Sequence, residues 1–102
     1  MTDFTHEVIE TIKSIPLGKI LSYGDIAKLC GAPKNSRQVS YILHSMSEKY
    51  NLPWHRVVNS QGKISLSGKK YDKQKQLLEA EGIVFNKNKI DFKKFSALIE
   101  NC

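Results

Sequence analysis

The stretch 53–60, which reads Pro-Trp-His-Arg-Val-Val-Asn-Ser, holds the side chains of this chain that are best suited to chemistry. It contains the only tryptophan, Trp54, followed directly by His55 and Arg56. An indole, an imidazole and a guanidinium can pack on a ligand and form hydrogen bonds with it. We interpret the stretch as the wall of a pocket, with an extended backbone at its start because Pro53 restricts the chain there.

Metal and redox chemistry are not indicated by the cysteines and histidines. Cys30 and Cys102 lie far apart and match no metal-binding or redox spacing. His6, His44 and His55 share no ligand spacing either. We therefore expect no metal and no cofactor, and we expect Cys30 to be a small buried hydrophobic residue.

The formal net charge of +6 is unevenly distributed along the chain. Residues 1–33 hold three basic and four acidic side chains, whereas residues 34–102 hold thirteen basic and six acidic ones. Positive charge gathered in one part of a small chain favours a polyanionic partner such as nucleic acid. A lysine-rich solvated surface is the alternative interpretation of the same composition.

The length of 102 residues predicts one domain, spanning residues 1–102, with one core and one shallow site. No run approaches 18 apolar residues, so we expect no membrane span. Residues 1–9 carry acids and lack an apolar segment, which argues against a signal peptide. We expect a monomer in the cytoplasm, associated with the nucleoid in a bacterium, or in the nucleus of a eukaryote.

The first half of the chain has the pattern of a helix-turn-helix. Apolar residues on one face of 4–15 predict a first helix. A second helix is expected to start at Ser22, which can form a capping box with Asp25, and to end at Gly31. Its predicted buried face comprises Ile26, Ala27, Leu29 and Cys30. A third helix is expected from residue 35 or 36, because Val39, Ile42, Leu43 and Met46 share one face.

The rest of the chain predicts smaller elements around one more helix. We expect a short strand at 63–66, a helix at 71–81, a hairpin at 83–90 that turns around 86–88, and a weak helix at 92–99. The predicted fold is mainly α with a small β-hairpin, a winged-helix-like helix-turn-helix domain. The outer face of the third helix carries polar side chains suited to phosphates and base edges, namely Lys34, Arg37, Ser40, Tyr41 and Ser45.

Five motifs in a fixed order carry a resemblance to a known family. They are Ile15-Pro16-x-Gly18-Lys19-Ile20, Ser22-Tyr23-Gly24-Asp25-Ile26-Ala27, Arg37-Gln38-Val39, the stretch 53–62 and Leu78-x-x-Glu81-Gly82. From about residue 4 to 84, the chain resembles the DNA-binding domain of O6-alkylguanine-DNA alkyltransferases. It is most similar to their small relatives, the alkyltransferase-like proteins. The separate N-terminal domain of the full enzymes is not expected within 102 residues.

The resemblance implies binding without catalysis. In the enzymes the central motif reads Pro-Cys-His-Arg-Val, and its cysteine takes the alkyl group. Here that position is Trp54, whose indole offers one N–H donor and no nucleophile. His55 and Glu81 match the pair that activates the cysteine. We therefore expect them, with Arg56 and Asn59 of the same region, to be a structural remnant in which His55 and Glu81 form a buried hydrogen-bonded pair.

The resemblance also assigns the residues that contact DNA. Tyr23 is expected to help rotate the nucleotide out of the duplex, and Arg37 to fill the gap that it leaves. Ser36, Ser40 and Tyr41 are expected to lie beside Arg37 on the DNA. Ser36 and Ser40 depart from the Ala and Gly usual in the family, so the third helix is expected to sit less closely in the groove.

The lesion pocket is expected to be lined by Tyr23, Pro53, Trp54, Val57, Ser67 and Gly68, with Trp54 facing the alkyl group. Some relatives have arginine where Ser67 stands, which leaves the preferred alkyl group open. The predicted function is a sensor that binds O6-alkylguanine in double-stranded DNA and marks it for nucleotide excision repair proteins. A residual alkyltransferase or other repair enzyme, and a helix-turn-helix transcription factor, are the alternatives.

Overall fold

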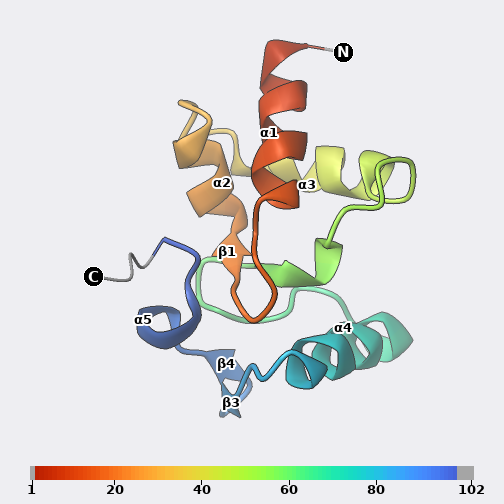
Figure 1. Ribbon diagram of the computed structural model, residues 1–102, viewed down its shortest axis with the longest axis vertical. Helices are drawn as coiled ribbons and strands as arrows, with labels where there is room; N and C mark the ends of the chain where they lie inside the picture. The colour runs from red at the N-terminus through yellow and green to blue at the C-terminus, as the bar shows by residue number, and fades with distance from the viewer. Residues whose placement is uncertain (1, 99–102) are drawn as a thin grey trace.

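The computed structural model describes residues 2–98, and its helices lie in two groups (Figure 1). The helices are α1 (Asp3–Lys13), α2 (Tyr23–Leu29), α3 (Ser36–Met46), the 3-10 helix η1 (Trp54–Arg56), α4 (Gly68–Ala80) and α5 (Phe92–Phe95). The strands are β1 (Leu21–Ser22), β2 (Val57–Val58), β3 (Phe85–Asn86) and β4 (Lys89–Ile90). Helices α1 to α3 form the upper group in Figure 1, and α4, the β3–β4 hairpin and α5 form the lower group. The predicted mainly helical fold with a small hairpin is confirmed.

The start of α2 is fixed by the predicted capping box. The hydroxyl of Ser22 accepts the N–H of Asp25 at 3.0 Å, and the carboxylate of Asp25 accepts the N–H of Ser22 at 3.0 Å. Two otherwise unpaired donors of the helix end are thereby satisfied. Tyr23, the first residue of α2, is consequently held in a defined direction.

The predicted buried face of α2 is partly wrong. Ile26 and Ala27 are fully buried, but Leu29 is 56% exposed. At about 100° per residue, Leu29 lies roughly 110° from the middle of the face that those two residues define. Cys30 points to the buried side but caps the helix end, so it is half-buried, with its Sγ 3.6 Å from the hydroxyl of Thr11.

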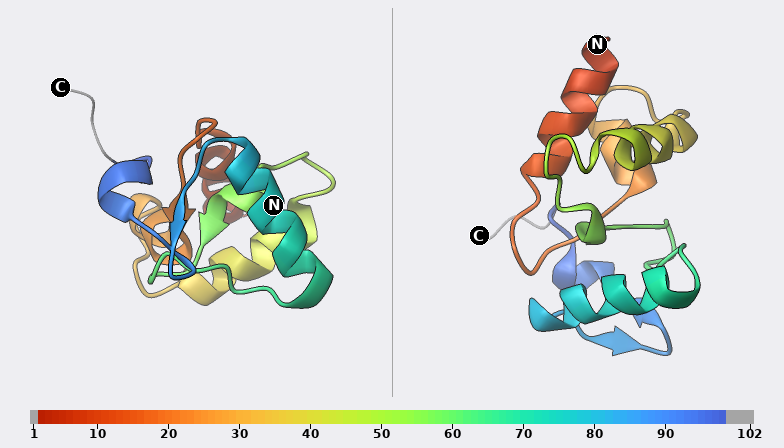
Figure 2. Two further views of the ribbon diagram at one scale, coloured as in Figure 1. Left: turned by 90° about the horizontal axis from the view of Figure 1, so that it is seen from below. Right: turned by 90° about the vertical axis from the view of Figure 1, so that its right-hand side faces the viewer.

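A short parallel pair joins the two halves of the chain. Leu21 of β1 pairs with Val57 of β2, and Ser22 pairs with Val58. The residues before α2 thereby bring its first turn beside the end of the 53–60 stretch. In the right-hand view of Figure 2, η1 (green) lies between the two helix groups. Strand pairing thus places the pocket stretch at the junction of the two groups.

The strand expected at 63–66 is absent from the structure. Ile64 is buried as a strand residue would be, but the free edge of β2 is already occupied. The side-chain amide of Gln74 donates to the carbonyls of His55 and Val57, both at 3.0 Å. The Val57 carbonyl, which a third strand would need as an acceptor, is therefore already bonded to a side chain of α4.

Helix α4 and the hairpin form around a second apolar cluster. α4 begins at Gly68, three residues before the predicted start, and buries Leu78 completely, whereas Leu77 is only half-buried. The predicted hairpin is present, but its turn is the two-residue pair Lys87–Asn88, with φ of 53° and 65°. Positive φ at both positions is the geometry of the tight hairpin turn that matches strand twist.

Helix α5 is shorter than the expected helix at 92–99. It ends at Phe95 because the next residues pair with the chain before β1: Ile20 donates to the carbonyl of Phe95 at 2.9 Å, and Ala97 donates to the carbonyl of Ile20 at 2.9 Å. The last residue of the predicted helix, 99, lies outside the described residues.

Candidate nucleic-acid interface

The stretch 53–56 turns instead of starting extended. Pro53 caps η1, and the N–H of Arg56 donates to the Pro53 carbonyl at 3.0 Å. The N–H of Trp54 donates to the carbonyl of Leu52 at 2.8 Å. The tight turn directs Trp54 to one side of the chain and the next two side chains to another. The indole and the imidazole of His55 meet edge to face, with centroids 6.1 Å apart and planes at 84°.

Glu81 is the centre of a hydrogen-bonded network behind the turn. His55 Nε2 lies 2.6 Å from Glu81 Oε2, so the predicted pair is present. Arg56 donates to both carboxylate oxygens, with its Nη2 2.9 Å from Oε2, and its Nη1 donates to the carbonyl of Ile15 at 2.8 Å. The N–H of Gly18 donates to Oε1 at 3.0 Å. Three segments far apart in the sequence are thereby joined at one carboxylate.

The network sets the charge of the Glu81 carboxyl. Burial by itself raises its pKa, since only 11% of the side chain is exposed. Hydrogen bonds from Arg56, from the Gly18 N–H and from His55 outweigh that effect and lower the pKa from 4.5 to about 2. The carboxylate is ionised at neutral pH and accepts, so His55 Nε2 carries the proton in this hydrogen bond.

Asn59 holds the turn that follows β2. Its Oδ1 accepts the N–H of Gln61 at 2.9 Å and that of Lys63 at 3.0 Å. Its own N–H donates to the Lys63 carbonyl at 3.0 Å. The side chain therefore shapes the loop that leads from the pocket stretch toward α4.

A cavity of about 80 Å³ lies beside the indole, between α2, α3 and α4. Its lining consists of Tyr23, Leu43, His44, Ser47, Trp54, Val57, Leu66 and Gln74. At its edge, the hydroxyl of Tyr23 lies 3.4 Å from that of Ser65. The cavity combines apolar walls with an indole, a phenol and an amide, which suits a planar heterocycle with polar edges.

Three of the six residues predicted for the lesion pocket line this cavity, namely Tyr23, Trp54 and Val57. Pro53, Ser67 and Gly68 do not. Pro53 is used as the cap of η1, while Ser67 and Gly68 are exposed at the start of α4. Because α4 begins early, the side chain that reaches the cavity from this loop is Leu66.

Cavity residues on two helices, α3 and α4, were not predicted. Leu43, His44 and Ser47 come from the inner side and end of α3, and their spacing carries no distinct signal. The inward position of Gln74 could have been predicted from its spacing, since it lies four residues before Leu78 and seven before Glu81, on the buried face of α4. A polar residue at an inward position needs hydrogen-bond partners, and here both are backbone carbonyls of the pocket stretch.

The outer face of α3 presents a second candidate surface, a shallow depression beside the start of the helix. Its lining consists of Lys34, Asn35, Arg37, Gln38 and Tyr41. Tyr41 is 72% exposed, and Arg37 is exposed and forms no salt bridge within residues 2–98. Ser36 and Ser40 are half-buried on the same helix. A free guanidinium and an exposed phenol are available here to contact a nucleic acid.

The described part of the chain has neither a metal-ion cluster nor a membrane-spanning helix. No group of three His, Cys, Asp or Glu side chains in residues 2–98 could hold a metal ion. None of the helices in the same range is long and apolar enough to cross a membrane.

Comparison with known proteins identifies relatives along most of the chain. Residues 3–83 match the family described as 6-O-methylguanine DNA methyltransferase, DNA binding domain. A DNA base-flipping protein of Vibrio parahaemolyticus is 47% identical over 96 residues, which cover 93% of this chain and 96% of the relative. Alkyltransferase-like protein 1 of Schizosaccharomyces pombe is 38% identical over 87 residues, covering 81% of this chain and 79% of the relative. A crystal structure of S. pombe Atl1 with damaged DNA containing O6-carboxymethylguanine superposes with a TM-score of 0.79 at 32% identity, covering 94% of this chain and 95% of that chain.

Proposed function

Because this chain belongs to the family of 6-O-methylguanine DNA methyltransferase DNA-binding domains, we propose that it is a non-enzymatic sensor of O6-alkylguanine in duplex DNA. The damaged nucleotide rotates out of the helix and its base enters the cavity beside Trp54. One observation carries the proposal: Trp54 stands where the alkyltransferase motif has its acceptor cysteine, and its side chain lines the cavity.

Alkyl transfer has no nucleophile at this site. An indole N–H is a hydrogen-bond donor and cannot displace an alkyl group from guanine. Cys30 caps α2 beside Thr11 and does not line the cavity. The names of the relatives, a base-flipping protein and an alkyltransferase-like protein, agree with recognition in place of transfer.

Selectivity arises first from the cost of opening the base pair. Rotating a nucleotide out of a duplex costs a few kcal/mol, and the cost is lower where pairing is already weakened. An alkyl group on guanine O6 removes the N1–H donor and occupies the pairing edge. Tyr23 at the start of α2 crowds the phosphate of the rotating nucleotide, and Arg37 on the outer face of α3 fills the vacated stack.

The cavity has to widen when the base enters. Its volume of about 80 Å³ is well below the roughly 300–1,000 Å³ of typical small-molecule pockets. The weak contact between the Tyr23 and Ser65 hydroxyls, at 3.4 Å, lies at its edge and is easily broken. The exposed residues Ser67 and Gly68 then become available to the base edges as the loop before α4 moves aside. Stacking on the indole adds about 1–3 kcal/mol.

The sensor acts as a monomer on DNA, in the bacterial cytoplasm or the eukaryotic nucleus. Its output is a persistent complex on the lesion that nucleotide excision repair proteins recognise. A protein without a transfer step leaves the alkyl group in place, so a separate pathway has to remove it.

A competition titration tests the proposal. Duplexes with O6-methylguanine, a bulkier O6-alkylguanine or plain guanine compete for the protein, and the fluorescence of the single tryptophan reports occupancy of the cavity. The wild type is expected to prefer both lesions and to show quenching on binding. Roughly five phosphate contacts give a slope of log affinity against log salt of about −4.5.

Three variants separate base recognition from charge. Arg37→Ala is expected to reduce the ratio of lesion to plain affinity, whereas Lys34→Ala, which removes an exposed charge near the same helix end, is expected to lower both affinities equally. Trp54→Ala lacks the only tryptophan, so its binding is followed by the fluorescence anisotropy of a labelled duplex. It is expected to abolish the preference, with circular dichroism confirming that the helices persist.

Three outcomes would refute the sensor. Equal wild-type affinity for lesion and plain duplex at every salt concentration removes its basis. Transfer of a labelled alkyl group to the protein, or release of the base, makes it an enzyme. Sequence-selective binding to undamaged DNA that survives Trp54→Ala makes it a transcription factor.

A further inference from the structure

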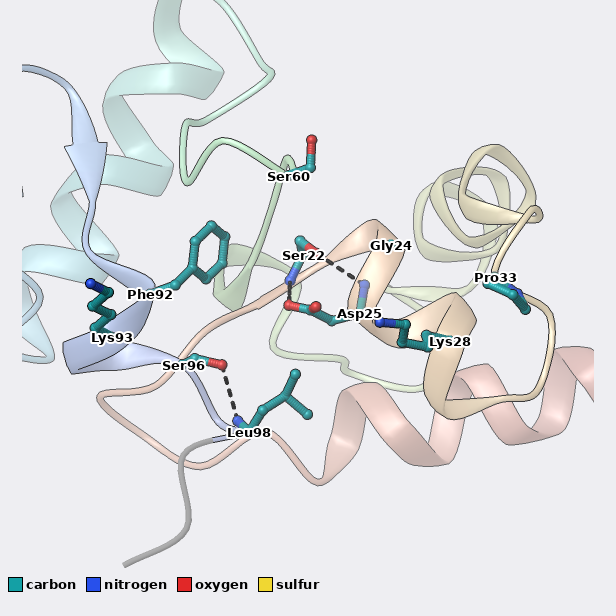
Figure 3. A pocket seen from close by; sticks show the side chains of 10 residues that line it. All are labelled: Ser22, Gly24, Asp25, Lys28, Pro33, Ser60, Phe92, Lys93, Ser96 and Leu98. Atoms are coloured by element: carbon teal, nitrogen blue, oxygen red, sulfur yellow. Dashed lines mark hydrogen bonds between the residues drawn. The ribbon is translucent and has the colours of Figure 1, made fainter.

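A groove of about 550 Å³ lies on the side of α2 that faces α5 (Figure 3). In Figure 3, Phe92, Lys93 and Leu98 line it from the left and below, Lys28 and Pro33 from the right, and Ser60 lies above. It shares no lining residue with the cavity beside Trp54.

The α5 side of this groove lies beyond residues 3–83, the segment that matches the family. It is nevertheless fixed in place. The two backbone hydrogen bonds of Ile20, with Phe95 and Ala97, hold the residues after α5 beside the chain that leads into β1. Asp91 caps α5 by accepting the N–H of Lys93 at 2.9 Å. This chain therefore has an ordered wall that the family segment does not supply.

The chemistry of the groove suits a polymer that alternates anionic and apolar groups. Lys28 and Lys93, both exposed, contribute one lysine to each of two walls. The single acid in the lining is Asp25, whose carboxylate already accepts the N–H of Ser22 at 3.0 Å. Phe92, together with the proline and leucine of the walls, supplies apolar surface between the charges. Phosphates separated by deoxyribose rings match this arrangement.

The groove adjoins both parts of the proposed DNA surface. Two of its lining residues, Ser22 and Gly24, flank Tyr23 directly in the sequence. Pro33 precedes the start of α3, four residues before Arg37. A DNA strand that reaches Tyr23 and the outer face of α3 therefore passes the open side of the groove.

We propose that this groove binds the sugar–phosphate backbone next to the flipped nucleotide, with Lys93 of the C-terminal segment contacting a phosphate. The proposal rests on the proposed function and extends its footprint beyond the family segment. The contact is independent of sequence and of the lesion, because it reads only the backbone. It strengthens binding to any duplex and leaves the preference for damaged guanine to Trp54 and Arg37.

The test compares Lys93→Gln with Lys94→Gln, its neighbour in the chain. Both variants lose one positive charge, but Lys94 does not line the groove and lies over the ring of Phe95, 5.7 Å from its centroid. Affinity for lesion and plain duplex is measured from 50 to about 300 mM salt, a range in which each phosphate contact contributes about 0.9 to the slope. Lys93→Gln is expected to reduce the slope by about 0.9 and to weaken both affinities roughly five-fold near 0.15 M salt. Lys28→Gln is expected to behave in the same way.

The outcome separates this proposal from the sensor itself. If the wild type prefers the lesion but Lys93→Gln and Lys94→Gln have the same slope of log affinity against log salt, the groove does not bind DNA and the proposal fails. The same result is expected if the groove binds an acidic protein instead. If the wild type shows no lesion preference, the sensor fails, and the slopes of the two variants still decide whether the groove binds the backbone. An unchanged ratio of lesion to plain affinity in Lys93→Gln supports a pure backbone contact.

Discussion

Replacing Glu81 by glutamine is expected to remove much of the acid sensitivity of this fold. The carboxyl has a pKa of about 2 in the folded chain, against 4.5 in its ordinary state. Folding therefore favours the ionised form, and the stabilisation is fully present above about pH 4.5 and disappears as pH falls toward 2. A difference of roughly 2.5 pKa units corresponds to about 3 kcal/mol of unfolding free energy.

Urea unfolding at several pH values between 7 and 2 measures this contribution. At pH 7, Glu81→Gln is expected to be about 3 kcal/mol less stable than the wild type, in the range known for breaking a buried ion pair. Toward pH 2, the two stabilities are expected to approach each other, because the Glu81 carboxyl is then about half protonated and most of the stabilisation from its ionised form is lost. Glu79→Gln, at an exposed glutamate two residues earlier, is expected to keep the wild-type pH dependence.

Parallel stability curves for the wild type and Glu81→Gln would show that the network does not stabilise the ionised carboxylate. A second measurement avoids any folding defect of the variant. In the wild type, the carboxyl carbon of Glu81 followed by NMR is expected to titrate near pH 2. A Glu81 titration at the ordinary value of 4.5 would contradict the geometry at the centre of the site.

Two further changes probe how the site is supported. Gly62→Ala is expected to destabilise the fold more than Gly31→Ala. Both glycines have positive φ, 78° and 76°, a conformation that costs alanine about 1–2 kcal/mol. A Cβ on Gly62 would also lie 2.5 Å from a carbonyl oxygen of β4, whereas a Cβ on Gly31 would meet nothing within 4 Å. Equal urea midpoints for the two variants would exclude the close approach. Gln74→Ala is expected to cost about 1–3 kcal/mol by leaving the half-buried carbonyl of His55 and the buried carbonyl of Val57 without this donor, whereas the exposed Gln76→Ala changes the midpoint little. A cost for Gln74→Ala no greater than that for Gln76→Ala would show that water replaces the amide.

The elements that could be predicted from the sequence are those fixed by neighbouring residues. The capping box at Ser22 needs only a partner three residues away, and the hairpin turn needs only two residues that tolerate positive φ. The pairing of Leu21 with Val57 joins residues 36 positions apart over a strand of two residues, too short to show a period. The predicted burial of Leu29 was wrong for a related reason, because a helix of seven residues buries only a narrow face.

The site was predicted unevenly for the same physical reasons. The pair of His55 and Glu81 followed from the resemblance, since nothing in their spacing places an imidazole beside that carboxylate. The cavity was half predicted because its walls come from four separate segments, and the early start of α4 exchanged Ser67 for Leu66. A backbone turn at Pro53, in place of an extended start, is what directs the indole into the cavity while the imidazole faces the carboxylate.

The hydrogen bonds of Glu81 give a reason for this network that does not depend on catalysis. In an enzyme, a histidine and a glutamate activate a cysteine; here the same carboxylate also binds the guanidinium of Arg56 and the N–H of Gly18. Removing the carboxylate would leave a largely buried guanidinium without its counter-ion, which is among the most costly changes in a small fold. The network can therefore hold the turn that carries Trp54 whether or not a nucleophile stands there. Under the proposed function, a single substitution at position 54 would change what the site does, from attack on an alkyl group to contact with it, without any need to change the residues that hold the turn.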